Sequence, residues 1–219
     1  MIDNHGFSFI YDVQNETDCA ESSKYLNLLK IPDGYTVNKK FLQGNMTITQ
    51  GYNAAMRLSP AKYKIYLNHS TAIINRNFLY QILSIFENHP KLGMLGVLGA
   101  KKLPPNGNWR EATERYGQIF YFGKPFVYNN HIILDYEQVQ AVDGMIMITQ
   151  YDLPWREDLF QDQFFYDTAQ CLEFTKAGYT VGIPKQSEPW CSNNNFSDTL
   201  ILFYLDRDLF LNEYQKFLN

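Results

Sequence analysis

The sequence predicts an α/β fold with a mostly parallel, mixed sheet flanked by helices. Between residues 7 and 100, strand patterns alternate with helical patterns over short connections. Alternation of this kind produces parallel strands joined by right-handed crossovers. The run Gly93–Ala100 (GMLGVLGA) is apolar throughout, as expected of a strand buried on both faces. After Ala100 the pattern changes to short aromatic and β-branched runs, which indicate hairpins.

The first half alternates four expected strands with three expected helices. We expect strands over residues 7–13, 36–42, 63–67 and 93–100, and helices from about residue 18 to 30, from 49 to 58 and from 75 to 88. Breakers punctuate this pattern, since Pro32-Asp33-Gly34, Pro60 and Pro90 each follow a predicted helix. The residues after the 63–67 strand, Asn68-His69-Ser70, are expected to lead into the third helix.

The second half is less regular. We expect a loop over residues 101–108, hairpins over 116–149, a strand over 138–149 interrupted by Asp143-Gly144, a helix over 164–176, a strand over 179–183 and a helix over 198–218. The chain contains no internal repeat and no convincing linker. We therefore expect one domain over residues 1–219, comprising a Rossmann-like half (7–100), a second half (101–197) and a C-terminal helix (198–219).

Composition excludes several classes of protein. The 219 residues are 45% hydrophobic, which is enough for a sizeable core. A net charge of −4 without a run of Lys and Arg argues against nucleic-acid binding. No stretch approaches the length of a membrane helix, and the first residues do not resemble a signal peptide. Three cysteines at unrelated spacings fit a reduced, cytoplasmic protein without a disulfide framework or zinc site.

The topology itself predicts a binding site. Ligands of parallel α/β sheets bind beyond the carboxyl ends of the strands. Three polar segments follow the first three strands, at residues 14–16, 43–45 and 68–70. They are expected to converge. The glycine-rich dinucleotide motif, the phosphate loop and the nucleophile elbow of hydrolases are all absent from the sequence.

Two aspartates are candidates for the chemistry. Asp143 lies inside an otherwise apolar strand, where a carboxylate is costly unless it binds something. The alternative is an acid in a turn or bulge, hydrogen-bonded to the main chain. Asp167 lies early in a helix, where a negative charge is also favourable on purely structural grounds. Arg156 follows Trp155 in a probable loop, and either a phosphate or a neighbouring acid would satisfy it.

Several stretches together resemble one family. They are FSFIYDVQNE, GYNAAMRLSPAKYKIYL, LGMLGVLGAKKLPPNGNW, AVDGMIMITQYDLPWRED, FYDTAQCLEFTKAGYTVGIPKQ and EPWC, and they cover residues 7 to about 193. In these stretches the chain resembles the GT-A, family-2-like glycosyltransferases, and within them the short bacterial branch named after a streptomycin-biosynthesis protein.

The resemblance implies transfer of a sugar from a nucleotide-sugar donor to an unknown acceptor. Asp167 matches the candidate base, and Asp143 would orient the acceptor. The residues expected to bind the nucleotide sugar are Val13, Glu16, Gln43, Gly44, Asn53, Asn68, His69 and Ser70. Those expected on the acceptor side are Gly144, Trp155, Arg156 and Trp190.

The chain departs from the family pattern where a metal would bind. Relatives typically carry His-Gln-Asp where this chain has Asn68-His69-Ser70, and an acidic residue where it has Gln43. The position of Asn193 corresponds to a histidine expected after the Trp-Cys pair. Active relatives use a divalent cation such as Mn²⁺ or Mg²⁺, which prefers carboxylate ligands. We therefore expect metal binding to be weak or absent, unless His69 binds from a shifted register or Arg and Lys replace the metal.

Two functions remain open from the sequence. The chain is an active glycosyltransferase, or it is a degenerate relative that binds a nucleotide sugar, a glycan or a protein without turnover. The apolar residues of the 198–218 helix would allow a homo-oligomer, although docking of this helix on the protein's own core is the preferred interpretation.

Overall fold

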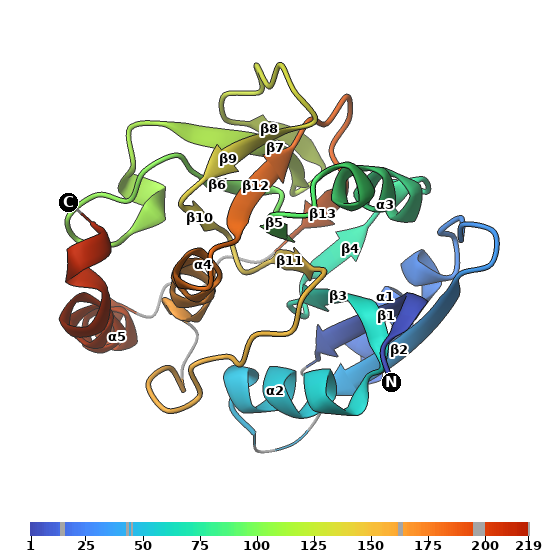
Figure 1. Ribbon diagram of the computed structural model, residues 1–219, viewed down its shortest axis with the longest axis horizontal. Helices are drawn as coiled ribbons and strands as arrows, with labels where there is room; N and C mark the ends of the chain where they lie inside the picture. The colour runs from blue at the N-terminus through green and yellow to red at the C-terminus, as the bar shows by residue number, and fades with distance from the viewer. Residues whose placement is uncertain (14–15, 43, 45, 162–163, 195–199, 219) are drawn as a thin grey trace.

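The computed structural model describes residues 1–13, 16–42, 44, 46–161, 164–194 and 200–218, and it has the expected α/β fold (Figure 1). The larger sheet has the strand order β2 (Thr36–Leu42), β1 (Asp3–Asp12), β3 (Ala61–Leu67), β11 (Ile146–Thr149), β5 (Leu92–Leu95), β12 (Thr180–Pro184) and β9 (Tyr136–Val139). The second sheet has the order β10 (Ala141–Val142), β6 (Leu98–Ala100), β7 (Arg115–Tyr121), β13 (Cys191–Asn193) and β4 (Thr71–Ile73), with β8 (Lys124–Val127) paired to β7.

Helices flank the two sheets. They are α1 (Glu16–Leu26), α2 (Ile48–Leu58), α3 (Phe78–Asn88), α4 (Tyr166–Lys176) and α5 (Leu200–Tyr214), with short 3₁₀ turns at Trp109–Glu111 and Gln215–Phe217. A capping box fixes the start of α2, because the side chains of Thr47 and Gln50 each accept a hydrogen bond from the other's backbone N–H. Figure 1 shows α2 near β1 to β3 and α4 near β10 to β12.

The larger sheet is mixed. Strand β1 pairs in parallel with β2 and β3, and β5 pairs in parallel with β12. Strand β11 lies antiparallel between β3 and β5, and β9 is antiparallel to β12. All side chains of β1 from Phe7 to Ile10 are buried, which explains the continuous apolar run in this strand.

The register places the ends of the first three strands side by side. Asp12 of β1 is paired with Leu42 of β2, and Tyr11 is paired with Leu67 of β3. The segments that follow these strands therefore leave the sheet at one edge. This is the edge at which topology predicts a ligand site.

Two long strands expected from the sequence are wrong. The apolar run Gly93–Ala100 is split between β5 and β6, which belong to different sheets. Gly96 lies at the break, and a Cβ atom there would lie 2.4 Å from the Cβ of Val142. The 138–149 segment likewise forms β9, β10 and β11 in two sheets. Hydrophobicity alone does not distinguish one buried strand from several, because β5, β6, β10 and β11 are each buried along their whole length.

Other boundaries also differ from expectation. After Asn68-His69-Ser70 the chain forms β4 before it reaches α3, whereas the sequence predicts a direct entry into the helix. Helix α3 begins at Phe78 rather than at residue 75, since Asn75 forms a turn whose side chain accepts the N–H of Asn77. Helix α1 ends at Leu26, four residues before its expected end.

The C-terminal helix docks on the protein's own core. Phe210 and Tyr214 of α5 are fully buried, and Phe210 stacks on Phe165 at a centroid distance of 5.0 Å. Tyr214 donates a hydrogen bond of 2.6 Å to Glu173 of α4. Within the described parts of the chain, none of the helices combines the length and the apolar character needed to cross a membrane.

Candidate active site

Asp143 and Asp167 meet at one turn of the main chain, around Gly144 and Met145. Asp143 follows β10, and Asp167 lies in the first turn of α4. The backbone N–H of Gly144 donates a hydrogen bond of 2.9 Å to Oδ2 of Asp167, and the N–H of Met145 donates one of 2.8 Å to Oδ1 of Asp143. The two carboxylates expected from the sequence are thus brought together, each held by the main chain of the same turn.

Arg110 forms an ion pair with Asp143. It lies in the 3₁₀ turn between β6 and β7, two strands of the second sheet. Its Nη2 donates to Oδ2 of Asp143 at 2.7 Å. The guanidinium also lies over the ring of Trp109, with its Cζ 4.9 Å from the ring centroid. More than half of the Arg110 side chain is exposed, at 57%, whereas the Asp143 side chain is only 8% exposed. Asp143 therefore pairs with a cation that remains accessible to solvent.

The environment of Asp167 raises its pKa to about 6. Burial contributes most, because it disfavours the charged carboxylate, and the negative charge of Asp143 acts in the same direction. Arg110 and the N–H groups of Thr168 and Gly144 lower the pKa and oppose this effect. A carboxylate with a pKa near neutrality can accept a proton and release it again at physiological pH.

Glycine is required at position 144 by close packing. A Cβ atom on Gly144 would lie 2.3 Å from the hydroxyl of Tyr166 and 3.2 Å from the Cβ of Asp167. The Tyr166 hydroxyl in turn donates to the Gly144 carbonyl at 3.4 Å. Gly144 therefore allows the two aspartates to share this turn.

The tip of β3 forms a neutral hydrogen-bonded network. Oδ1 of Asn68 accepts from the hydroxyls of Ser70 at 3.2 Å and Thr71 at 2.5 Å. Nδ2 of Asn193, from β13, donates to Ser70 at 3.1 Å and to Thr71 at 2.9 Å. The N–H of Asn68 donates to the carbonyl of Met145, so this network lies next to the Asp143 turn.

Asp12 is a site residue that the sequence analysis missed. It is the last residue of β1, and burial raises its pKa while the nearby imidazole of His69 lowers it. Its charge also acts on the buried hydroxyls of Tyr52 and Tyr166, whose pKa values are raised mainly by burial. The strand-end rule would have found Asp12, since it immediately precedes Val13. Arg110 carried no comparable signal.

Three of the expected site residues contact other parts of the protein in this structure. Trp190 is 1% exposed and packs edge-on against Phe78. The amide of Asn53 both donates to and accepts from the main chain of Trp155, at 2.9 and 2.8 Å. Arg156 pairs with Asp158 and Glu213. The expected substrate contacts of Trp190, Asn53 and Arg156 stay predictions, and in this structure core or intramolecular partners contact these side chains.

Of the remaining expected residues, Val13 and Gly44 lie just after β1 and β2, whereas Trp155 lies in the loop between β11 and α4. Val13 is buried, and its N–H donates to the carbonyl of Leu42 at 3.3 Å. Gly44 is exposed with a φ of +113°. Trp155 is buried against Tyr52 and Tyr66, beneath α4. Glu16 begins α1, and its side chain, like Gln43, lies outside what the structure describes.

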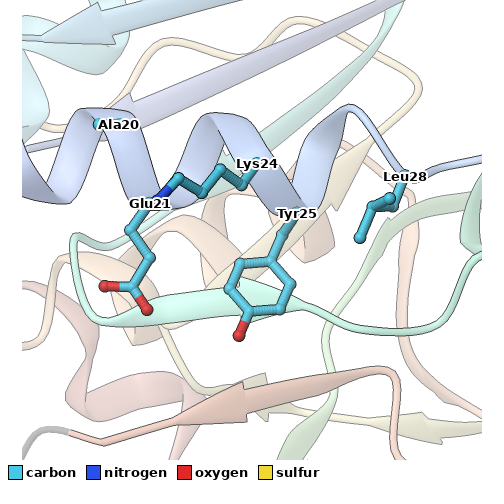
Figure 2. A pocket seen from close by; sticks show the side chains of 5 residues that line it. All are labelled: Ala20, Glu21, Lys24, Tyr25 and Leu28. Carbon is cyan, nitrogen blue, oxygen red and sulfur yellow. The ribbon is translucent and has the colours of Figure 1, made fainter.

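A hollow of about 350 Å³ lies along α1 (Figure 2). It is lined by Ala20, Glu21, Lys24, Tyr25 and Leu28. Glu21 and Tyr25 project from the same side of the helix in Figure 2. None of these side chains belongs to the Asp143–Asp167 cluster. In the described part of the chain, no three His, Cys, Asp or Glu side chains gather in a way that would hold a metal ion.

A family model matches almost the whole chain. The model is described as a glycosyltransferase-like family, and the match covers residues 8–214. No match was found among curated proteins.

Solved structures with the same fold were found at low identity. TarS from S. aureus in complex with UDP-GlcNAc is 12% identical, with a TM-score of 0.55 over 88% of this chain and 59% of that one. The mannosyltransferase PcManGT from Pyrobaculum calidifontis, in complex with GDP-Man and Mn²⁺, is 10% identical, with a TM-score of 0.52 over 87% of this chain and 56% of that one. These likenesses support the GT-A fold. The chain spans about three fifths of the length of these two solved chains, of which the TarS chain is itself residues 1–349, and 37% of a longer solved TarS chain.

Proposed function

We propose that this chain, which belongs to the glycosyltransferase-like family, transfers a sugar from a nucleotide-sugar donor to an acceptor hydroxyl. The observation that carries the proposal is the buried Asp167 carboxylate, held by the Gly144 N–H and poised with a pKa of about 6. The family match over residues 8–214 supports it, as do the nucleotide-sugar complexes of TarS and PcManGT, which share the fold.

In the proposed reaction the acceptor oxygen attacks the anomeric carbon of the donor. The bond from that carbon to the diphosphate oxygen breaks, and the nucleoside diphosphate leaves with the electron pair. Asp167 takes the proton from the acceptor hydroxyl. Asp143, paired with Arg110, orients the acceptor from the other side of the same turn. The donor lies over the ends of β1 to β3, near Val13, Asp12 and His69.

The β3 tip does not fit a divalent cation. A hard cation requires oxygen ligands, with carboxylates preferred. The oxygens of Asn68, Ser70 and Thr71 are neutral and already hydrogen-bonded to one another. Asn193 points a donor N–H group toward Ser70, where a cation would require an acceptor. We therefore infer that donor binding does not depend on Mn²⁺ or Mg²⁺. We also propose that the chain belongs to the short bacterial branch of the family that is named after a streptomycin-biosynthesis protein.

Thermal unfolding tests both the binding of a nucleotide donor and its independence of a divalent cation. UDP, GDP, CDP and dTDP, and sugars linked to them, would each be added with and without Mn²⁺. A ligand that binds only the native state at a hundredfold excess over its Kd stabilises the protein by about 2.7 kcal/mol. We expect a rise in Tm with one nucleotide class that is the same with and without manganese.

The variant Ser70→Asp provides the matched comparison. It restores a carboxylate at the tip of β3, and we expect the nucleotide-induced shift to become larger with manganese. Absence of a shift with every nucleotide would contradict donor binding. A shift in the wild type that requires manganese would contradict only the metal inference. Nucleotide binding without turnover of any donor would identify a binding module instead of an enzyme.

A further inference from the structure

The hairpin formed by β7 and β8 has a strained turn. Tyr121 pairs with Lys124, so the turn contains only Phe122 and Gly123. Both have positive φ values, +46° and +73°. Two-residue turns of this type favour Asn-Gly or Gly-Gly, because bulky side chains are disfavoured in the left-handed region. Phenylalanine at position 122 therefore costs stability.

Packing does not compensate for this cost. The Phe122 side chain is 59% exposed. Its ring meets the neighbouring ring of Tyr121 edge-on, at a centroid distance of 4.7 Å and an interplanar angle of 77°. A strained backbone that presents an exposed aromatic ring is a reason to look for a functional role. Phe122 lowers the stability of the folded protein, and a contact with a ligand would account for a phenylalanine at this position.

The turn lies next to the candidate active site. Tyr121 is paired with Asn193 in the parallel β7–β13 ladder, and the N–H of Phe122 donates to the Asn193 carbonyl at 3.4 Å. The Asn193 side chain donates to Ser70 at the tip of β3. Paired residues of adjacent strands point to the same face of a sheet, so Tyr121 lies on the face that carries this network.

More aromatic side chains continue along the same face of the hairpin. Phe126 pairs with Ile119, which shares a face with Tyr121, and its ring lies 6.2 Å from that of Tyr121. The ring of Phe126 contacts that of Tyr128 at 4.9 Å. Tyr128 meets Trp109 at 6.4 Å, next to the Arg110–Asp143 pair. The aromatic strip, defined as Tyr121, Phe122, Phe126 and Tyr128, thus runs from the β3 tip to the acid cluster.

We propose that the aromatic strip binds a sugar ring of the acceptor, with Phe122 as its outermost contact. This inference rests on the proposed glycosyl transfer. An acceptor saccharide has apolar C–H faces that suit aromatic rings and hydroxyl edges that remain available for hydrogen bonds. Arg110 and Asp143, at the far end of the strip, supply polar partners for those edges. The strip lies on the second-half side of the site, separate from the ends of β1 and β2.

The substitution Phe122→Asn separates binding from folding. Asparagine is favoured in this turn, so F122N should raise the Tm by roughly 2–4 °C if it relieves about 1 kcal/mol of strain. Labelled wild-type protein would be screened on a glycan array, with and without UDP, GDP, CDP and dTDP. The tightest soluble saccharide would then be titrated into each variant. We expect F122N to bind it about tenfold more weakly, equivalent to about 1.4 kcal/mol, and F122Y to bind it like the wild type.

Leu58→Asn is the matched control. Leu58 is 73% exposed at the end of α2, close to the start of β3 and hence at the opposite edge of the sheet from the strand tips. L58N should not change saccharide affinity. Failure of every array glycan to bind the wild type would overturn the inference, as would unchanged saccharide affinity in F122N. A lower Tm in F122N would assign Phe122 to packing, and a matching loss of nucleotide affinity would assign it to the donor. The Tm shifts that nucleotides cause in the wild type test the proposed function separately.

Discussion

The two polar clusters of the site differ in charge although they lie side by side. The β3 tip, with Asn68, Ser70 and Asn193, is a neutral network of amides and hydroxyls. The turn at Gly144 brings together two aspartates and an arginine. The Asn68 N–H bonded to the Met145 carbonyl connects the clusters directly. The proposed mechanism moves its proton at the turn that holds the two aspartates and Arg110, while Asp12 and His69 are the ionisable groups at the strand ends.

This difference indicates which part of the chemistry the fold still supports. Holding a carboxylate pair in a buried turn is expensive, and the chain provides main-chain donors and Arg110 to support it. Such an arrangement would not be needed for packing alone. The amides and hydroxyls of Asn68, Ser70 and Asn193 at the β3 tip carry no charge, so under the proposed function the imidazole of His69 and solvent are left there to meet the charge of the departing diphosphate.

The largest expected effect is on the charged cluster. Asp167→Asn removes the proposed base while keeping an oxygen that can accept the Gly144 N–H. General-base catalysis contributes roughly 10²–10⁴-fold, and we expect a loss of that size in the rate of sugar transfer. The rate would be measured as release of nucleoside diphosphate in the presence of acceptor.

Asp158→Asn is the control for this loss. Asp158 is an exposed carboxylate that pairs with Arg156. Its removal should leave the transfer rate within about twofold of the wild type, because exposed ion pairs contribute little. Equal rates for the wild type and D167N would exclude Asp167 as the base.

The pH dependence of stability sharpens the comparison further. The pKa of Asp167 is raised from 3.8 to about 6, so the native state binds this proton more tightly than the unfolded state. As pH rises from about 4 to 6, the unfolded state ionises first and the free energy of unfolding falls. The total is about 3 kcal/mol, at 1.36 kcal/mol per pKa unit. Well below pH 3.8 the carboxyl is protonated in both states and the penalty is absent.

Urea unfolding of the wild type and D167N at pH 4, 5, 6 and 7 measures this effect. The stability of the wild type relative to D167N should fall between pH 4 and 6 and then level off. A difference that stays constant across the range would show that the native Asp167 titrates normally. The variant comparison cancels the contribution of acids that do not interact with Asp167, while that of Asp143, which does, is included in the difference.

Much of the fold was predictable because it follows from local patterns. The alternation of strands and helices up to Leu95 and the position of α4 were expected from hydrophobic spacing and breakers. The splitting of Gly93–Ala100 was not, because Gly96 turns the chain between two sheets through contacts with Val142, a residue 46 positions away along the chain. Patterns within one segment carry no information about such a partner.

Only those site residues were predictable that follow the end of a strand or are acids in an unusual sequence context. Asp143 and Asp167 were identified because a carboxylate in an apolar strand and one at a helix start are recognisable in sequence. The contact between them depends on the close approach that Gly144 permits. Arg110 reaches Asp143 from a loop 33 residues earlier in the chain, and only the folded structure brings them together.

The smallest of these effects tests whether packing at the turn maintains the charged cluster. In Gly144→Ala the new Cβ would lie 2.3 Å from the Tyr166 hydroxyl, so either Tyr166 or the Asp167 backbone must move. Overpacking of this kind costs about 1–3 kcal/mol, which chemical denaturation measures. Adding Tyr166→Phe to G144A removes the nearest atom and should recover part of that stability. It should also recover part of the pH dependence, because the backbone N–H of residue 144 can again approach Asp167. If G144A is as stable as the wild type, the turn is not tightly packed, and the charged cluster would differ from the β3 tip only in its charges.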